Sequence, residues 1–202
     1  FASKDAVVSW QTSKDQKCDK VILRNDLTWS DGKPITAHDV EFSFKLIMTE
    51  EIPVPAQRSG TDKIKCVKAY DDHTLVYFHK DALATNIWNV NFSVVPKHIY
   101  DNQKELSNDP TLQNSEYWVK NEKSPISGGA YVFANRTLGQ GAVLERRDSY
   151  FMHEGKQVRD KPYYKTVRFK FAKDPAASLL QLKGGDLHEM ILTPPQWLHE
   201  TG

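Results

Sequence analysis

The sequence predicts an α+β fold, with a mixed sheet made of hairpins and joined by short helices. Its strand-like segments occur in neighbouring pairs separated by turn residues, and they do not alternate regularly with helices. The helical patterns are short, and ten prolines punctuate the chain. The 202 residues, 39% of them hydrophobic, suffice to bury a core in one large or two small domains.

The charge balance and hydropathy exclude several classes of protein. A formal net charge of +1 argues against a nucleic-acid binder, which would need a basic face. No run of about 18 apolar residues occurs, so the sequence predicts no membrane span. The chain begins at Phe1 without an initiator methionine or a signal peptide, which is typical of an excised or processed chain.

The first strands lie before residue 24. Ala6, Val8 and Trp10 alternate weakly and are expected on one side of a strand. A charged turn over residues 14–20 then leads into a second short strand, Val21 to Leu23.

Residues 27–48 read as a strand, a tight turn and a capped helix. Asp31 and Gly32 supply the turn, since glycine tolerates positive φ. Thr36 is expected to cap the helix, with Asp39 reaching back as in a capping box. The apolar stripe has helical spacing and consists of Val40, Phe44, Ile47 and Met48.

The clearest hairpin runs from residue 64 to residue 79, around the turn Asp71, Asp72 and His73. These three residues are interpreted as turn residues and not as a catalytic cluster. Residues 101–123 are polar and are expected to hold a short helix. A glycine turn at 124–131 precedes a strand, and a second strand returns over residues 142–147.

The last third of the chain predicts one more strand and one more helix. In residues 165–172, Val167, Phe169 and Phe171 share a face by strict alternation. Asp174 is expected to cap a helix, which Gly184 and Gly185 end.

No motif of catalysis, metal binding or phosphate binding stands out. The seven histidines form no His-x-x-x-His pair, and the sequence lacks the glycine-rich loops and the nucleophile elbow. We therefore predict no catalytic residue, no metal and no cofactor. Cys18 and Cys66 have no metal-site spacing, and either a disulfide between them or two free thiols is compatible with the sequence.

The stretch from Leu27 to Val40, LTWSDGKPITAHDV, closely resembles the signature of the family 5 extracellular solute-binding proteins. Further segments resemble motifs of that family in the same order. They are the hairpin after Val67, the Pro96-Lys97-His98 helix start, the Ser127-Gly-Gly-Ala-Tyr131 turn, Arg146-Arg147-Asp148-Ser149-Tyr150 and the segment around Gly185. Ala130 departs from the family's proline, and His188 stands near its usual acidic residue.

The resemblance implies one lobe of a type II periplasmic-binding-protein-like fold. Residues 1–202 would form the first lobe, with a small subdomain over about residues 40–125 and the second lobe absent. It implies an exported receptor, periplasmic or a cell-surface lipoprotein, that passes a small solute such as a peptide to the membrane subunits of an ABC importer. A sensor, a regulator or an enzyme that reuses such a lobe is the alternative.

Within this resemblance the signature is interpreted as scaffold, and the ligand is expected to meet other residues. The structural set is Trp29, Ser30, Asp31, Gly32, Thr36, Asp39 and Val40. The expected ligand-binding set, chosen for aromatic, amide and exposed backbone groups, is Trp88, Asn89, Asn91, Phe92, Gly128, Gly129 and Tyr131. Ordinary core packing is the alternative for Trp88 and Phe92.

Overall fold

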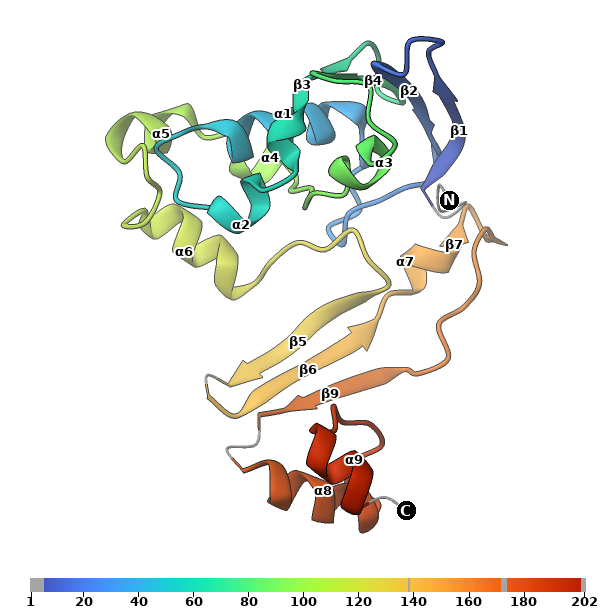
Figure 1. Cartoon of the computed structure of the whole chain (residues 1–202), viewed down its shortest axis with the longest axis vertical. Helices are drawn as coiled ribbons and strands as arrows, with labels where there is room; N and C mark the ends of the chain where they lie inside the picture. The colour runs from blue at the N-terminus through green and yellow to red at the C-terminus, as the bar shows by residue number, and fades with distance from the viewer. Residues whose placement is uncertain (1–5, 138, 172–173, 201–202) are drawn as a thin grey trace. The chain divides into compact units, whose positions relative to one another are not determined.

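A computed structural model describes residues 6–137, 139–171 and 174–200, and its chain divides into two compact units (Figure 1). Unit 1 comprises Phe1–Val132 and Arg146–Lys165, and unit 2 comprises Phe133–Glu145 and Thr166–Gly202. Both units combine short helices with antiparallel strands. The predicted α+β class is therefore confirmed.

Unit 1 is built on a four-stranded antiparallel sheet with the order β1-β2-β4-β3. The strands are β1 Val7–Thr12, β2 Cys18–Leu23, β3 Ile64–Ala69 and β4 Thr74–His79. The predicted hairpin is confirmed as β3 and β4. Asp71 closes its turn by accepting hydrogen bonds from the amides of His73 and Thr74, at 2.8 and 2.6 Å.

The predicted alternation of the first strand is wrong in one detail. The register of β1 against β2 shifts between Val7 and Ser9. Because this irregularity reverses the alternation, Val8 is 68% exposed while Trp10 packs inward against Tyr77, with ring centroids 6.2 Å apart.

Helix α1, Ala37–Met48, covers the inner face of this sheet and contacts β3 and β4 (Figure 1). The predicted capping box holds the start of the helix. The Asp39 carboxylate accepts a hydrogen bond from the Thr36 amide at 2.7 Å. Burial follows the predicted stripe, and the cluster between helix and sheet comprises Val21, Ala37, Val40, Phe44, Ile47, Ile64, Val67, Ala69, Leu75, Tyr77 and Phe92.

A buried polar network closes one end of this core. The Asp19 carboxylate accepts hydrogen bonds from the Trp10 indole at 3.1 Å and the Thr12 hydroxyl at 2.6 Å. His79 Nε2 lies 2.7 Å from the same carboxylate, and its side chain is fully buried. Burial, with a smaller effect of the Asp19 charge, raises the pKa of the neighbouring Tyr77 phenol far above its ordinary value.

Short helices surround the core of unit 1. They are α2 Pro55–Arg58, the 3₁₀ helix η1 Thr61–Lys63, α3 Asn86–Asn89, α4 Lys97–Tyr100, α5 Gln103–Asn108, α6 Glu116–Lys123 and α7 Asp148–Phe151. Two helices, α5 and α6, stand in residues 101–123, where the sequence predicts one. A two-stranded pair, β7 Met152–His153 and β8 Lys156–Gln157, was not predicted.

The two cysteines do not form the disulfide that was one alternative. Both are free thiols. Each pairs with Phe78, Cys18 from β2 and Cys66 from β3, so one whole strand separates them. Two strand spacings amount to about 10 Å, whereas a disulfide needs Cα atoms within about 7 Å.

Unit 2 contains most of a three-stranded sheet, made of β5 Tyr131–Thr137, β6 Gly141–Arg146 and β9 Thr166–Lys170 in the order β5-β6-β9. Gly141 has a φ of 156°, and an added Cβ would lie 2.0 Å from the Phe169 carbonyl oxygen, so only glycine fits there. Phe169 in β9 and Phe171 just after the strand are 52% and 59% exposed.

Two helices follow β9 in unit 2, α8 Pro175–Lys183 and α9 Pro194–His199. The predicted cap of α8 is confirmed, because the Asp174 carboxylate accepts the Ala176 amide at 2.9 Å. Gly185 follows the end of the helix and has a φ of 84°, a left-handed conformation that is common after helix C-termini. Helix α9 was not predicted, although Thr193 followed by proline is a common helix start.

Candidate functional site

The signature turn is a rigid polar corner of unit 1. Trp29 is 3% exposed, and its amide donates to the Lys33 carbonyl at 2.8 Å. Gly32 takes a φ of 86°, as the turn requires. The Asp31 carboxylate accepts the Lys33 amide at 3.1 Å. Through these contacts the signature residues stabilise the backbone conformation of their own turn.

Arg147 ties this corner to a segment more than 100 residues later in the chain. Its guanidinium donates to the carbonyl oxygens of Ser127 at 2.6 Å, Gly129 at 3.0 Å and Thr28 at 2.8 Å. The residue is 6% exposed, and burial lowers the pKa of its guanidinium below the ordinary value. Arg147 therefore joins the signature to the glycine turn; we call this the Arg147 clamp.

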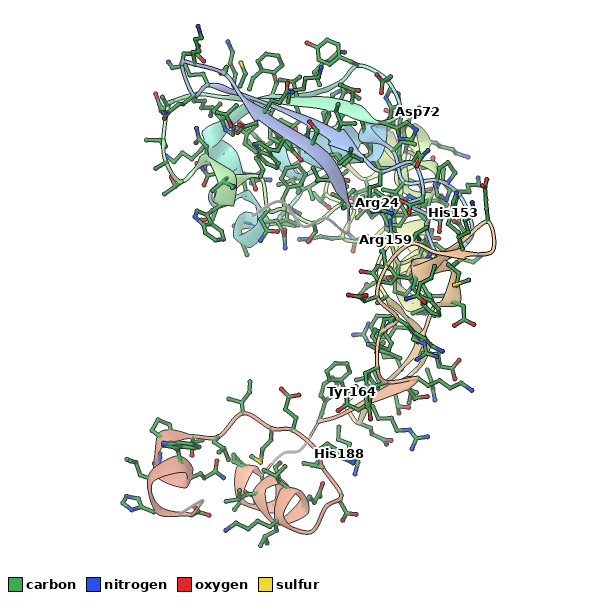
Figure 2. All side chains as sticks on the ribbon, turned by 90° about the vertical axis from the view of Figure 1, so that its right-hand side faces the viewer. Arg24, Asp72, His153, Arg159, Tyr164 and His188 are labelled. Carbon is green, nitrogen blue, oxygen red and sulfur yellow. The ribbon has the colours of Figure 1, made fainter. Side chains whose placement is uncertain are left out.

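A second buried cluster stands beside the clamp, and we call it the Asp26 triad. The Asp26 carboxylate accepts two hydrogen bonds from Arg24, at 2.8 and 2.6 Å, and one from Arg159 at 3.0 Å. Figure 2 shows the two arginines side by side in unit 1. The hydrogen bonds from Arg24, aided by the charge of Arg159, outweigh burial and lower the pKa of Asp26 to about 2.

The signature also binds helix α4. His98 Nε2 lies 2.6 Å from the Asp31 carboxylate, and the second oxygen of Asp39 accepts the Lys97 amide at 2.7 Å. Burial alone would raise the pKa of Asp31, but hydrogen bonds from His98 and the Lys33 amide outweigh it, so the pKa is lowered. Asp39 thus orders the first turns of two helices at once.

An open polar hollow of about 450 Å³ lies beside these contacts. It is lined by Lys33, Pro34, Thr36, Asp39, Lys97, His98 and Asp101. Asp39 and His98 are already occupied by the contacts above. Of the remaining charged groups, the Lys97 ammonium lies 3.8 Å from the Asp101 carboxylate, and Lys33 adds a second ammonium, so the surface has mixed charge.

The aromatic and amide residues of the expected ligand-binding set have different environments. Trp88 in α3 is 70% exposed, which leaves its ring face accessible. Asn91 is also exposed. Phe92 is 9% exposed and packs against Phe44 and Tyr77, so its alternative, ordinary core packing, describes it. The Asn89 side chain donates to the side-chain amide oxygen of Asn86, Oδ1, at 3.4 Å.

The residues of the glycine turn make more contacts within the protein than the sequence implies. A Cβ on Gly128 would lie 2.9 Å from Ile35 and 3.2 Å from Trp29, so this glycine lets the turn pack on the signature. The Gly129 amide donates to the Ser127 hydroxyl at 3.1 Å. The Tyr131 hydroxyl donates to the Tyr164 carbonyl at 2.8 Å. The structure gives these residues scaffold contacts and does not bring them against Trp88.

Sequence reasoning missed the arginines and Asp26. Arg147 reaches the Thr28 carbonyl across 119 residues and Arg159 reaches Asp26 across 133, and no local pattern reveals such contacts. Arg24, in contrast, lies two residues from Asp26. The one available signal is the Arg146-Arg147 pair at the end of a strand, since two adjacent residues of a strand point to opposite faces. Arg146 accordingly donates to the Pro162 carbonyl at 2.9 Å, on another side from the clamp.

The described part of the chain contains no group of three or more His, Cys, Asp or Glu side chains placed to hold a metal ion. Within the same residues, no helix has the length and hydropathy needed to cross a membrane.

Comparison with known proteins gives a consistent result. The model of a family described as bacterial extracellular solute-binding proteins, family 5 middle, matches residues 3–200. The chain is 30% identical over 173 residues to the oligopeptide-binding protein AppA of Bacillus subtilis (strain 168), covering 83% of this chain and 28% of that protein.

Solved structures agree with this match. A putative peptide-binding protein AppA from Clostridium difficile superimposes with a TM-score of 0.72 at 25% identity, over 90% of this chain and 35% of the other. AppA of Bacillus subtilis in complex with a nonapeptide gives a TM-score of 0.68 at 25% identity, over 90% and 34%. The chain thus spans about a third of the length of the proteins it matches.

Proposed function

Because the chain belongs to the family 5 bacterial extracellular solute-binding proteins, we propose that it forms part of a receptor that captures peptides or similar small solutes for an ABC importer. The family consists of solute-binding receptors, not enzymes. The match over residues 3–200 carries this proposal. The name of the relative AppA and the nonapeptide in its crystal structure support a peptide as the solute.

In this proposal residues 1–202 supply the first lobe, with residues of about 40–125 as a small subdomain. The rest of the longer protein supplies the second lobe. Solute binds between the lobes and favours the closed arrangement, as differential affinity for two states requires. The receptor acts outside the cytoplasm, in the periplasm or as a cell-surface lipoprotein, and delivers its solute to the membrane subunits of the importer.

The residues divide into scaffold and contact groups. The signature, the Arg147 clamp and the Asp26 triad hold the lobe together. Trp88 is the strongest candidate for solute contact, because its exposed ring offers a stacking face at low entropic cost. Asn91 beside it offers amide donors and an acceptor. Phe92, which is buried, supports this segment from the core.

The identity of the solute is tested by native mass spectrometry of the full-length receptor purified without refolding. We expect the purified receptor to carry a bound mass that fragments as a peptide. If it is purified empty, we expect it to retain peptides from a mixture added afterwards. Retention of a non-peptide solute, with no retention of peptides, would refute the peptide proposal.

The contact role of Trp88 is tested in the same full-length receptor by Trp88→Ala. We expect peptide affinity to fall by about fivefold to tenfold, the effect of losing one aromatic stacking contact. Tyr163→Ala is the matched control, since that ring is 90% exposed and should leave affinity unchanged. Equal affinity of Trp88→Ala and the wild type would remove Trp88 from the site.

A further inference from the structure

The outer face of the four-stranded sheet of unit 1 is left open. In Figure 1 the helices of unit 1 lie on the other side of this sheet, where α1 packs. Strand alternation places Lys20, Val76 and Phe78 on the outer face, since Asp19, Leu75 and Tyr77 beside them are buried inward. This face, from here on the outer sheet face, has both apolar and charged side chains.

The charges on the outer sheet face have one sign. The register aligns Lys20, Val76 and Lys68 in one cross-strand row. Lys65 is also exposed where the register of β3 shifts. The four strands contain a single acidic residue, Asp19, which is 4% exposed and bonded on the inner side. The lysines therefore have no carboxylate partner within the strands, although the charge of Lys68 contributes slightly to lowering the pKa of Glu41 in α1.

The outer sheet face is also hollowed. A depression of about 400 Å³ is lined by residues that include Lys20, Tyr70, Val76 and Phe78. Tyr70 is 63% exposed and stands at its wall. Val76 and Phe78 are half-buried, so they form a floor and do not protrude. An apolar floor with an aromatic wall and an ammonium at its rim receives an apolar side chain flanked by carboxylates.

We infer that the outer sheet face is a docking surface for an acidic peptide segment of a partner protein, with an aromatic side chain of that segment in the hollow. Carboxylates on either side of the aromatic residue pair with Lys20 and Lys68. An anionic membrane is the weaker match, because membrane insertion needs protruding apolar side chains. This inference concerns a surface separate from the solute contact proposed at Trp88.

The inference is tested with a fluorescein-labelled peptide of sequence Asp-Glu-Phe-Asp-Glu, blocked at its C-terminus, and fluorescence anisotropy. We expect saturable binding that weakens as salt rises to about 150 mM. The double variant Lys20→Glu/Lys68→Glu should lose about tenfold or more in affinity, because two attractions become repulsions. Lys104→Glu/Lys120→Glu, which makes the same charge change on α5 and α6, should bind like the wild type.

A second variant and a second readout test the inference independently, in case the charge-reversed protein binds poorly because it misfolds. Tyr70→Ser removes the exposed wall without touching the core and should also weaken binding. Cys18 and Cys66 flank Phe78 on this face, so bound peptide should slow their reaction with a maleimide.

Four outcomes would overturn the inference. They are no saturation up to about 1 mM peptide, equal loss of affinity in the control double variant, unchanged thiol reactivity at saturation, and binding to phosphatidylglycerol vesicles without binding to the peptide.

Discussion

Replacing Asp26 by asparagine removes the charge at the centre of the Asp26 triad and keeps its shape. The carboxylate is 5% exposed and its pKa lies at about 2, against 3.8 in an ordinary setting. At 1.36 kcal/mol per pKa unit, this difference of about 1.8 units is worth about 2.5 kcal/mol of stability. Because the folded-state pKa is the lower one, this contribution is complete above about pH 5 and is lost as the pH falls through about 2.

The variant also leaves two arginines around a neutral group, so we expect Asp26→Asn to lose about 3 kcal/mol near pH 6. Between pH 6 and pH 3 the Asp26 charge loses about 1 kcal/mol of its contribution to the free energy of unfolding of the wild type. The variant lacks this charge, so its free energy of unfolding does not change for this reason. The difference in free energy of unfolding between wild type and variant should therefore fall by about 1 kcal/mol from pH 6 to pH 3.

Urea unfolding followed by tryptophan fluorescence at a series of pH values measures this gap. Glu50→Gln, which removes an exposed carboxylate from the loop after α1, is the control and should follow the wild type throughout. A gap of constant size from pH 6 to pH 3 would show that the charge of Asp26 does not stabilise the fold, and would refute the reasoning.

Three further predictions address the same unit. Arg147→Met should cost about 3 kcal/mol in urea unfolding, because the carbonyls of the Arg147 clamp lose their buried donors; a loss below about 0.5 kcal/mol would contradict the clamp. Gly128→Ala should cost about 1–3 kcal/mol by the same measurement, because its Cβ would meet Ile35 at 2.9 Å. Two thiols should titrate in the denatured, unreduced 202-residue chain, and none would mean that Cys18 and Cys66 are bridged after all.

Local sequence patterns were sufficient to predict the helices and strands, but not the contacts that join distant segments of the chain. The capping box at Thr36 and Asp39 and the Asp174 cap depend on neighbours within a few residues, so the sequence predicts them. The irregularity at Val8 depends on how β1 meets β2, and a single strand carries no sign of it. The Arg147–Thr28 contact of the clamp and the Arg159–Asp26 contact of the triad each span more than 100 residues, which periodicity cannot encode.

Residue type alone does not predict which members of the expected ligand-binding set are accessible. Trp88 and Phe92 are four residues apart in one aromatic and amide run, yet one ring is exposed and the other is buried against Phe44. Only the packed core decides between them. At the glycine turn, packing against Ile35 and Trp29 is by itself sufficient reason for glycine at position 128.

The long sequence separation of the arginine contacts sets the order of folding. Arg147 meets Thr28 across 119 residues, and Arg159 meets Asp26 across 133. Closing such long loops costs entropy that only the finished contacts repay, so these ties form late. A nascent chain can pair β1 to β4 early, but unit 1 is sealed only after residue 159 has been synthesised. Until then, the Asp26 carboxylate has Arg24 but not Arg159 as a partner.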